Sequence, residues 1–368
     1  MLLSPIHYYP PSKLDFTGIN VVTIYLGDTC NFDCVYCDRE YIKQDIGSQN
    51  LLTKDEDDIV SFVELVAREA KDLKNISFHG GEPFLYIQRI DRLLERIQPL
   101  FDKDFLFFIT TNGSLIKDNE WFFKKWGSQL RITLSYDFNY QEVNREKIDL
   151  KLISKIVRDN NAGMLFQFVI PSNLPGAFHH DTIHAVLRDM REANCNSLNL
   201  IPLRHHRGAR KFKVLIDDMD LKWFAVDLMR FVHTMYVNGI QIHIDGNYDK
   251  IDKRYLNNHG KLILSPDGYI YPEFDYLEYK RTEFRIGQWR GEPKLYRVSS
   301  EEEYILPQCR ECVSRDACGL KYLYKMFDET PSGACIEFYK IINLMVAHLH
   351  ELKKKPTLMH WIGINERE

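Results

Sequence analysis

The sequence predicts an α/β protein built on a parallel sheet, and three observations predict it. The first two-thirds of the chain alternates short apolar runs with longer amphipathic stretches, the pattern changes after about residue 240, and chemically reactive residues follow directly after several apolar runs. Strands separated by helices pair in parallel through right-handed crossovers. Six such units are compatible with a partial barrel or a doubly wound sheet, and in either case ligands bind at the carboxyl ends of the strands.

Each element follows from hydrophobic periodicity. Predicted strands cover residues 21–27, 76–79, 105–111, 131–136, 164–170 and 197–202. The helices that follow them cover residues 55–73, 88–100, 118–126, 149–159, 181–193 and 219–238, and Thr53 is the predicted N-cap of the first.

A second, smaller domain is expected after residue 240. A strand over residues 241–244 precedes a β-hairpin, whose strands 261–264 and 269–271 flank a Ser265-Pro266-Asp267-Gly268 turn. A cysteine-rich segment and an amphipathic helix over residues 336–353 follow. We expect an N-terminal segment 1–18, a core 19–240, a second domain 241–354 and a tail 355–368.

Composition excludes several classes of protein. The chain has 368 residues, of which 45% are hydrophobic and 27% charged, as in ordinary soluble proteins. Its 48 basic and 52 acidic residues give a net charge of -4, so general nucleic-acid binding is not expected. No long apolar run predicts a membrane span, and residues 1–15 lack the basic, apolar character of a signal peptide. We therefore expect a cytoplasmic protein.

The eight cysteines are unevenly distributed. Three lie within eight residues near the start, four lie within 27 residues near the end, and Cys195 stands alone. Disulfides fit poorly with a large chain that has no secretory signal and an odd-numbered first group. Metal or iron–sulfur ligation is the better interpretation of both groups, whereas Cys195 is interpreted as a packed thiol.

The first group has the spacing C-x3-C-x2-C and lies on the loop after the first strand. It consists of Cys30, Cys34 and Cys37. Three thiolates can hold three irons of a [4Fe–4S] cluster and leave the fourth iron open. Zinc is the alternative, but structural zinc normally takes four ligands and catalytic zinc usually takes His or carboxylate, and no histidine occurs between His7 and His79.

This motif, with the aromatic Tyr36 before its third cysteine, resembles that of the radical S-adenosylmethionine (radical SAM) superfamily. Three further motifs match the superfamily in order after the next three strands: Gly80-Gly81-Glu82-Pro83, Thr111-Asn112-Gly113 and Ser135-Tyr136-Asp137. The resemblance covers about residues 20 to 240. It implies a partial (β/α)6 TIM-like barrel, a SAM-binding [4Fe–4S] cluster and SAM as cofactors, and a SAM pocket that includes Pro83, Thr111 and Asn112.

The resemblance also implies roles for these residues. Gly80 and Gly81 would let the backbone approach the methionine end of SAM closely, and Glu82 would accept a hydrogen bond from its amino group. Ser135 and Asp137 would face the ribose hydroxyls, although Asp137 could instead be a helix N-cap. An electron donor such as a flavodoxin or ferredoxin would reduce the cluster, which cleaves SAM to a 5′-deoxyadenosyl radical that takes a hydrogen atom from the substrate.

The second cysteine group has four members and so suffices for a closed [4Fe–4S] cluster or an all-cysteine zinc site. It comprises Cys309, Cys312, Cys318 and Cys335. Together with the preceding hairpin, it resembles the SPASM/twitch extension of radical SAM maturases, which implies one auxiliary [4Fe–4S] cluster. A full SPASM domain holds two, but Glu273, Tyr322 and residues 257–259 stand where the inner cluster's cysteines are expected.

Other side chains are weaker candidates. Glu273 and Asp275 are the candidate catalytic acids, as a general base or an anchor for a substrate amine. Arg204, in the basic run 204–211, would bind an anionic substrate or the SAM carboxylate, or would belong to a solvated loop. Gln167, Asn199 and Tyr136 are expected to point into the barrel, and Gln167 and Asn199 are candidate cofactor-binding residues.

We expect a radical SAM oxidoreductase of the maturase type that acts on a peptide or protein side chain. The cluster motif begins at residue 30, so no separate leader-peptide-binding domain is expected before it. A first alternative is a radical SAM enzyme acting on a small molecule or nucleotide, with the basic run binding a phosphate. An alternative of another class is a non-catalytic zinc-binding interaction protein.

Overall fold

The computed structural model describes residues 16–37, 50–170, 178, 180–202, 221–244, 260–272, 274, 277, 282, 285–295, 340–342 and 344–345. The chain divides into two compact units. Unit 1 comprises Met1–Ser135, Glu146–Leu165 and Ile251–Glu303, and unit 2 comprises Tyr136–Arg145, Phe166–Lys250 and Tyr304–Glu368.

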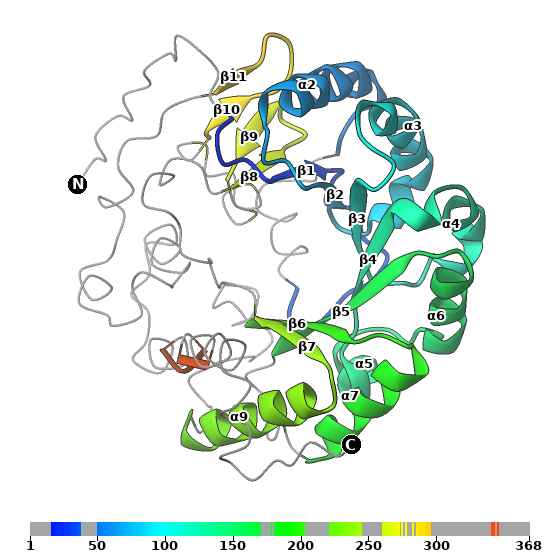
Figure 1. Cartoon of the computed structure of the whole chain (residues 1–368), viewed down its shortest axis with the longest axis vertical. Coiled ribbons are helices and arrows are strands. Elements are labelled where there is room, and N and C mark those ends of the chain that lie inside the picture. Colours follow the sequence, from blue (N-terminus) through cyan, green and yellow to red (C-terminus); the bar gives the residue numbers. More distant parts are fainter. Residues whose placement is uncertain are drawn as a thin grey trace. The chain divides into compact units, whose positions relative to one another are not determined.

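Unit 1 contains a mixed sheet whose centre is parallel (Figure 1). Its parallel strands are β1 (Val21–Tyr25), β2 (Asn75–His79), β3 (Leu106–Thr111), β4 (Leu130–Ser135) and β8 (Lys261–Leu264). The antiparallel strands β9 (Tyr269–Tyr271), β10 (Gly287–Gln288) and β11 (Lys294–Leu295) continue the sheet beyond β8, giving the order β11-β10-β9-β8-β1-β2-β3-β4. Strand β1 is therefore central, with β2 on one side and β8 on the other.

Helices cover the apolar face of this sheet (Figure 1). They are α2 (Glu56–Glu69), α3 (Ile87–Ile97), α4 (Glu120–Trp126) and α6 (Leu150–Asp159), with short 3-10 turns at Thr53–Asp55, Pro83–Tyr86, Gln98–Leu100, Lys117–Asn119 and Gly127–Gln129. One row across β1 to β4 consists of Ile24, Phe78, Ile109 and Ile132, all fully buried. Each such side chain contributes about 1.5–3 kcal/mol through burial.

The opposite face of the same strands carries polar side chains. Thr23 and Ser77 are paired in register, and their hydroxyl oxygens are 2.7 Å apart. Alternation along β2 leaves Asn75, Ser77 and His79 half-exposed between the buried Ile76 and Phe78. In β1 and β4 this second face is buried as well, since Thr23 is 1% exposed and Ser135 is 8% exposed.

Unit 2 contains the parallel strands β5 (Gly163–Ile170), β6 (Ser197–Pro202) and β7 (Gln241–Ile244). The first three residues of β5 are assigned to unit 1, and the strand belongs to unit 2 from Phe166 onward. Helices α5 (Gln141–Asn144), α7 (His180–Glu192) and α9 (Leu221–Val237), and a 3-10 turn over Phe138–Tyr140, also belong to it. Phe178 packs between β5 and α9, since its ring centre lies 6.4 Å from that of Phe168 and 4.8 Å from that of Phe231.

The predicted strands and the helices that follow them are confirmed in order, with ends that shift by a few residues. The prediction of Thr53 as N-cap is wrong. Thr53 begins a 3-10 turn, and the carboxylate of Asp55 accepts the hydrogen bond from the N–H of Leu52 at 3.0 Å. The hairpin is also confirmed, and Gly268 supplies its positive φ of 90°. Of the predicted helix 336–353, the structure describes only residues 340–342 and 344–345, which are helical.

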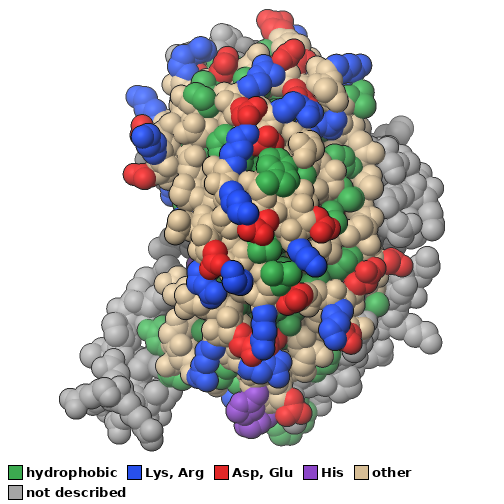
Figure 2. Space-filling view, turned by 90° about the vertical axis from the view of Figure 1, so that its right-hand side faces the viewer, with side chains coloured by type: hydrophobic (Ala, Val, Ile, Leu, Met, Phe, Trp, Pro, Cys, Tyr) green, Lys and Arg blue, Asp and Glu red, His purple; other side chains and the backbone are tan. Residues whose placement is uncertain are grey.

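The surface shown in Figure 2 carries acidic and basic side chains interspersed, with apolar side chains between them. Ion pairs link charged side chains of the described residues, such as Lys125 with Asp91 at 2.8 Å and with Glu95 at 2.6 Å. Among the described residues, no helix is long and apolar enough to cross a membrane.

Candidate functional site

The loop that carries the first three cysteines is closed at its base by backbone pairing. The N–H of Leu51 donates to the carbonyl of Leu26 at 2.9 Å, and Gly27 forms an antiparallel bridge with Asn50. The N–H of Leu26 in turn donates to the carbonyl of His79, at the end of β2. Both ends of the cysteine loop are therefore attached to the end of the parallel sheet.

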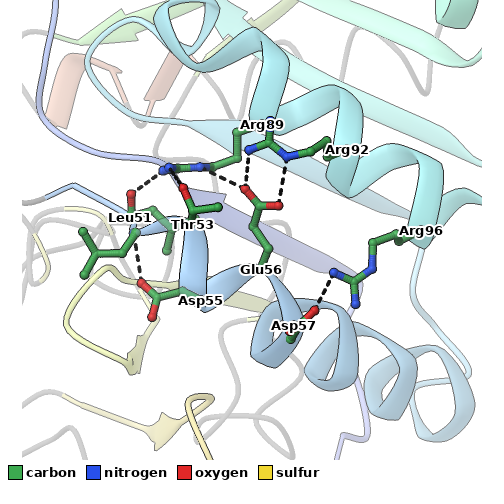
Figure 3. Close-up of polar contacts among 9 residues, drawn as sticks. Leu51, Thr53, Asp55, Glu56, Asp57, Arg89, Arg92 and Arg96 are labelled. Carbon is green, nitrogen blue, oxygen red and sulfur yellow. Dashed lines mark hydrogen bonds and ion pairs between the residues drawn. The ribbon is translucent and has the colours of Figure 1, made fainter.

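Polar side chains hold the segment that follows the cysteine loop, residues 51–56, against α3 (Figure 3). Arg89 donates to the carbonyl of Leu51 and, at 3.1 Å, to the hydroxyl of Thr53. Glu56 lies within ion-pair distance of both Arg89 and Arg92, at 3.3 and 2.6 Å. The Glu56 side chain is only 9% exposed and Arg89 only 15%, whereas Arg92 is 47% exposed, so the inner part of this network is shielded from solvent. It fixes the segment that closes the cysteine loop.

The three cysteines are thiols in positions of different exposure. Cys34 is buried, and Cys30 and Cys37 are half-buried. The N–H of Cys37 donates to the carbonyl of Cys34 at 2.9 Å, which folds the second half of the motif into a turn. The N–H of Phe32 lies 3.5 Å from the Cys30 sulfur, as a donor to it.

Three thiols on one anchored loop are a donor set that fits an iron–sulfur cluster. Within the described part of the chain, no three Cys, His, Asp or Glu side chains are gathered as they would be around a single metal ion. The thiolates of a cluster bind different irons, so they need not converge on one point.

The two glycines after β2 let two loop backbones touch. The N–H of Gly81 donates to the carbonyl of Gly27 at 2.7 Å, and a Cβ atom on Gly81 would lie 2.1 Å from the carbonyl oxygen of Thr29. Gly80 has a φ of 151°, and a Cβ there would lie 2.6 Å from the Gly27 oxygen. These glycines therefore have a structural reason besides the predicted approach to SAM, because they dock the cysteine loop on β2.

Glu82 is fully buried and connects the loops after β2 and β3. Its Oε1 accepts hydrogen bonds from the hydroxyl of Thr111 at 2.7 Å and from the N–H of Phe84 at 2.9 Å, and its Oε2 accepts from the N–H of Asn112 at 2.8 Å. Pro83 begins the 3-10 turn that Glu82 caps. The predicted contact of Glu82 with the SAM amino group remains a prediction, and the structure adds that this carboxylate organises the pocket's backbone.

Asn31, Asn112 and Ser114 form a closed ring of side-chain hydrogen bonds. Asn112 Nδ2 donates to Asn31 Oδ1 at 2.9 Å, Asn31 Nδ2 donates to Ser114 Oγ at 2.9 Å, and Ser114 Oγ donates to Asn112 Oδ1 at 2.6 Å. This ring links the cysteine loop to the loop after β3. Sequence reasoning selected Asn112 but missed Asn31 and Ser114, whose only signal was their position beside two motifs.

The motif after β4 is buried. Ser135, at the end of β4 in unit 1, is 8% exposed. In unit 2, Asp137 is fully buried, with its Oδ2 3.6 Å from Nε of Arg145, a partner that sequence reasoning missed. Asp137 stands at the N-cap position of a 3-10 turn but makes no side-chain capping bond there.

Tyr136 packs within unit 2, against β5 and α7. Its hydroxyl donates to Asp189 on α7 at 3.1 Å, and its N–H donates to the carbonyl of Gln167 at 2.9 Å. Burial, reinforced by the charge of Asp189, raises the pKa of Tyr136 above its ordinary value.

Gln167 and Asn199 lie side by side on the half-exposed face of β5 and β6. The register adds His243 on β7 beside Asn199. His243 is exposed, and the strict alternation of Gln241–Ile244 was the signal that could have identified it. The three side chains form a polar row on one face of unit 2.

Several predicted residues lie outside the described part of the chain: Arg204 and the rest of the run 204–211, residues 257–259, Glu273, Asp275, Cys309, Cys312, Cys318, Tyr322 and Cys335. Cys195 is described and buried, and its sulfur donates to the carbonyl of Ser197 at 3.5 Å. Burial raises the pKa of its thiol, which favours the neutral form and fits a packing role.

Comparison with known proteins identifies the domain that holds these motifs. Residues 24–168 match the profile of the Radical SAM superfamily. The chain carries a radical SAM domain. This domain makes the protein an enzyme, and the superfamily of the domain implies SAM and a [4Fe–4S] cluster, which the thiol set of the anchored loop fits.

The curated relatives of the chain have names that refer to a nucleotide or a deazaguanine. The chain is 26% identical over 268 residues to GTP 3',8-cyclase of Listeria welshimeri, covering 68% of this chain and 77% of the relative. It is 28% identical over 143 residues to 7-carboxy-7-deazaguanine synthase of Methanocaldococcus jannaschii, covering 36% of this chain and 56% of the relative.

Solved structures show the same fold over most of the chain. The structure of anSMEcpe with bound AdoMet and Kp18Cys peptide has a TM-score of 0.65 at 18% identity, covering 91% of this chain and 99% of that chain. Streptococcus suis SuiB bound to S-adenosylmethionine has a TM-score of 0.60 at 13% identity, covering 86% of this chain and 76% of that one. The predicted fold class, an α/β partial barrel, is confirmed.

Proposed function

We propose that this radical SAM enzyme abstracts a hydrogen atom from a peptide or protein side chain. The observation that carries the proposal is the extent of the likeness to peptide-bound anSMEcpe, which spans 91% of this chain and 99% of that one. The likeness is one of fold, and its span includes most of the chain beyond the radical SAM domain at residues 24–168.

Cys30, Cys34 and Cys37 would hold the SAM-binding cluster, and the cradle of Gly80, Gly81 and Glu82 would receive the methionine end of SAM. When bound, the cluster and SAM supply a one-electron reductive cleavage that yields a 5′-deoxyadenosyl radical, the hydrogen-atom acceptor. The chain's own residues position these groups. The β-bridge between Gly27 and Asn50 fixes the base of the cysteine loop. Buried Glu82 joins the loop after β2 to the loop after β3.

Gln167 and Asn199 would bind the cofactor, and the polar row that they form with His243 would also contact the substrate. Neutral amides and an imidazole can bind peptide N–H and carbonyl groups without a fixed charge. Ser135 and Asp137 would bind the ribose of SAM. Glu273 and Asp275 would act as a general base or hold a substrate amine.

The remaining parts of the proposal concern the chain beyond the radical SAM domain. Cys309, Cys312, Cys318 and Cys335 would hold one auxiliary [4Fe–4S] cluster in a SPASM/twitch-like domain over residues 241–354, with a role in electron transfer or structure. The enzyme would work in the cytoplasm, where a flavodoxin or ferredoxin would reduce it.

Anaerobic reconstitution with iron and sulfide tests this function. Two clusters predict about eight irons per chain, and a Cys30→Ala, Cys34→Ala, Cys37→Ala variant should lose about half of them. The wild type under reduction should form 5′-deoxyadenosine from SAM, and the triple variant should not. Peptides deuterated at their side chains should transfer deuterium into 5′-deoxyadenosine. Zinc uptake without iron, or no 5′-deoxyadenosine, would overturn radical SAM catalysis by this chain.

A nucleotide or other small molecule is the second candidate substrate, and the names of the sequence relatives favour it. In that case the basic run 204–211 would bind a phosphate. Charge reversal through Arg204→Glu and Arg207→Glu separates the candidates. Turnover of a nucleoside triphosphate should be lost in this variant, whereas turnover of an uncharged peptide should persist.

A further inference from the structure

The orientation of the Asn112 side chain is fixed by a backbone donor. The N–H of Ser114 lies 3.0 Å from Asn112 Oδ1 and can only donate. The oxygen of the amide must therefore face Ser114, and the nitrogen must face the cysteine loop. Asn112 is only 6% exposed, so its orientation is maintained by protein partners rather than by water.

The Asn112 Nδ2 atom has two hydrogens and two acceptors within reach. One acceptor is Asn31 Oδ1 at 2.9 Å, and the other is the Cys30 sulfur at 3.9 Å. Sulfur is large and polarisable, so hydrogen bonds to it are longer than those to oxygen. The N–H of Phe32 reaches the same sulfur at 3.5 Å, which gives Cys30 one backbone donor and one side-chain donor.

We propose that Asn112 is a positioning residue that donates a hydrogen bond to the Cys30 sulfur and raises the reduction potential of the cluster held there. The inference rests on the proposed role of Cys30 as a cluster ligand. Reduction adds negative charge to a cluster, and that charge is shared by the ligating sulfurs. Donors aimed at those sulfurs therefore stabilise the reduced state more than the oxidised state.

The test compares Asn112→Ala and Asn112→Asp with the wild type in the reconstituted full-length chain. The fraction of reduced cluster is followed by electron paramagnetic resonance at a series of set potentials, and the first cluster is recognised as the signal that changes when SAM is added. The ratio of reduced to oxidised cluster at a fixed potential should fall roughly threefold to tenfold in Asn112→Ala. It should fall further in Asn112→Asp, because this variant keeps the shape but replaces the donor with a negative charge.

Ser114→Ala is the matched control. It removes the hydroxyl from the ring of three side chains but keeps the Ser114 N–H that orients Asn112, so the potential should stay at the wild-type value. A shift in Ser114→Ala as large as that in Asn112→Ala would overturn the inference, since loop rigidity would then explain both. An unchanged potential in Asn112→Asp would also overturn it.

A second measurement detects the contact directly. In chains labelled with ¹⁵N-asparagine, pulsed electron paramagnetic resonance should detect a nitrogen coupled to the reduced first cluster that is present in the wild type and missing in Asn112→Ala, since the neighbouring Asn31 is labelled in both. Equal nitrogen couplings in the two chains would contradict the inference. The proposed function has its own point of failure. A wild-type chain that takes up no iron overturns the cluster assignment itself, whereas iron-loaded chains with equal potentials overturn only the role of Asn112.

Discussion

Nη2 of Arg290 lies 2.9 Å from Oδ1 of Asp55, so an ion pair joins the segment after β10 to the beginning of α2. The Asp55 side chain is 2% exposed, and its other oxygen accepts the hydrogen bond from the N–H of Leu52. Arg290 also donates to the carbonyl of Pro266 in the hairpin turn, and its guanidinium lies 5.1 Å from the ring centre of the buried Trp289. One carboxylate thus connects the late hairpin to the helix that follows the cysteine loop.

Replacing Asp55 should destabilise unit 1. Asp55→Ala leaves the Arg290 charge and the Leu52 N–H without their acceptor, and we expect the free energy of unfolding to fall by about 2–4 kcal/mol. Urea unfolding measures it. The matched control is Asp57→Ala, because Asp57 is 85% exposed and pairs with Arg96 at the surface (Figure 3). That change should cost less than about 1 kcal/mol. Equal costs would refute the role assigned to Asp55.

Gly81→Ala should separate the cysteine loop from β2. A Cβ atom 2.1 Å from the Thr29 oxygen cannot be accommodated without moving backbone, so we expect a cost above about 2 kcal/mol and poor iron loading. Gly239→Ala is the comparison. Gly239 has a φ of 74° with no atom within 4 Å of the added Cβ, so it should cost only about 1 kcal/mol and load iron normally. Normal iron loading in Gly81→Ala would argue against this loop contact.

Thr111→Val should lower the stability of the fold and the affinity for SAM, because it removes a hydrogen bond to Glu82. The substitution keeps the shape of the side chain but removes the hydroxyl donor 2.7 Å from the buried carboxylate. We expect a loss of about 1–2 kcal/mol in the free energy of unfolding, and weaker SAM binding by the reconstituted enzyme in calorimetry. Thr110→Val changes the half-exposed neighbour on the same strand and should shift stability by less than about 0.5 kcal/mol. The same SAM affinity in Thr111→Val and wild type would show that the hydrogen bond from Thr111 to Glu82 does not affect SAM binding.

Alkaline pH should destabilise the fold partly through Tyr136. Burial, and then the charge of Asp189, hold the pKa of Tyr136 above its ordinary value near 10, so the folded chain keeps a proton that the unfolded chain releases. Because the folded state then binds more protons, this contribution is complete below about pH 10 and is lost as pH rises beyond it. Urea unfolding at a series of pH values should show a shallower decline above about pH 10 for Tyr136→Phe. An identical decline in the variant would contradict this assignment.

The sequence predicted the elements well because their signals are local. The run at residues 105–111 needed only its own apolar and β-branched residues to indicate β3, which spans Leu106–Thr111. The order of the motifs likewise followed from their positions after successive strands. The prediction of Thr53 as the cap failed because the helix begins two residues later, after a 3-10 turn, and only the folded backbone shows where that turn ends.

Contacts between distant segments left no such signal. Nothing around Asp137 in the sequence indicates Arg145 as its partner, and nothing around Asn31 indicates Ser114, since loop conformation decides both pairs. The same holds for Lys261, which pairs with Val21 across most of the chain. Glu82 shows how far the role of a site residue can be predicted from the sequence. Its motif predicted a ligand contact, whereas its burial and three protein donors appear only in the fold.

The insertion of β8 beside β1 has a consequence for synthesis on the ribosome. Until residues 261–264 emerge, one side of β1 lacks its parallel neighbour, and its unpaired N–H and carbonyl groups can attract other strands. Pairing between segments so far apart is also slow to form. The sheet that bears the cysteine loop can therefore be completed only late in translation, and a nascent chain is most exposed to misassembly before then.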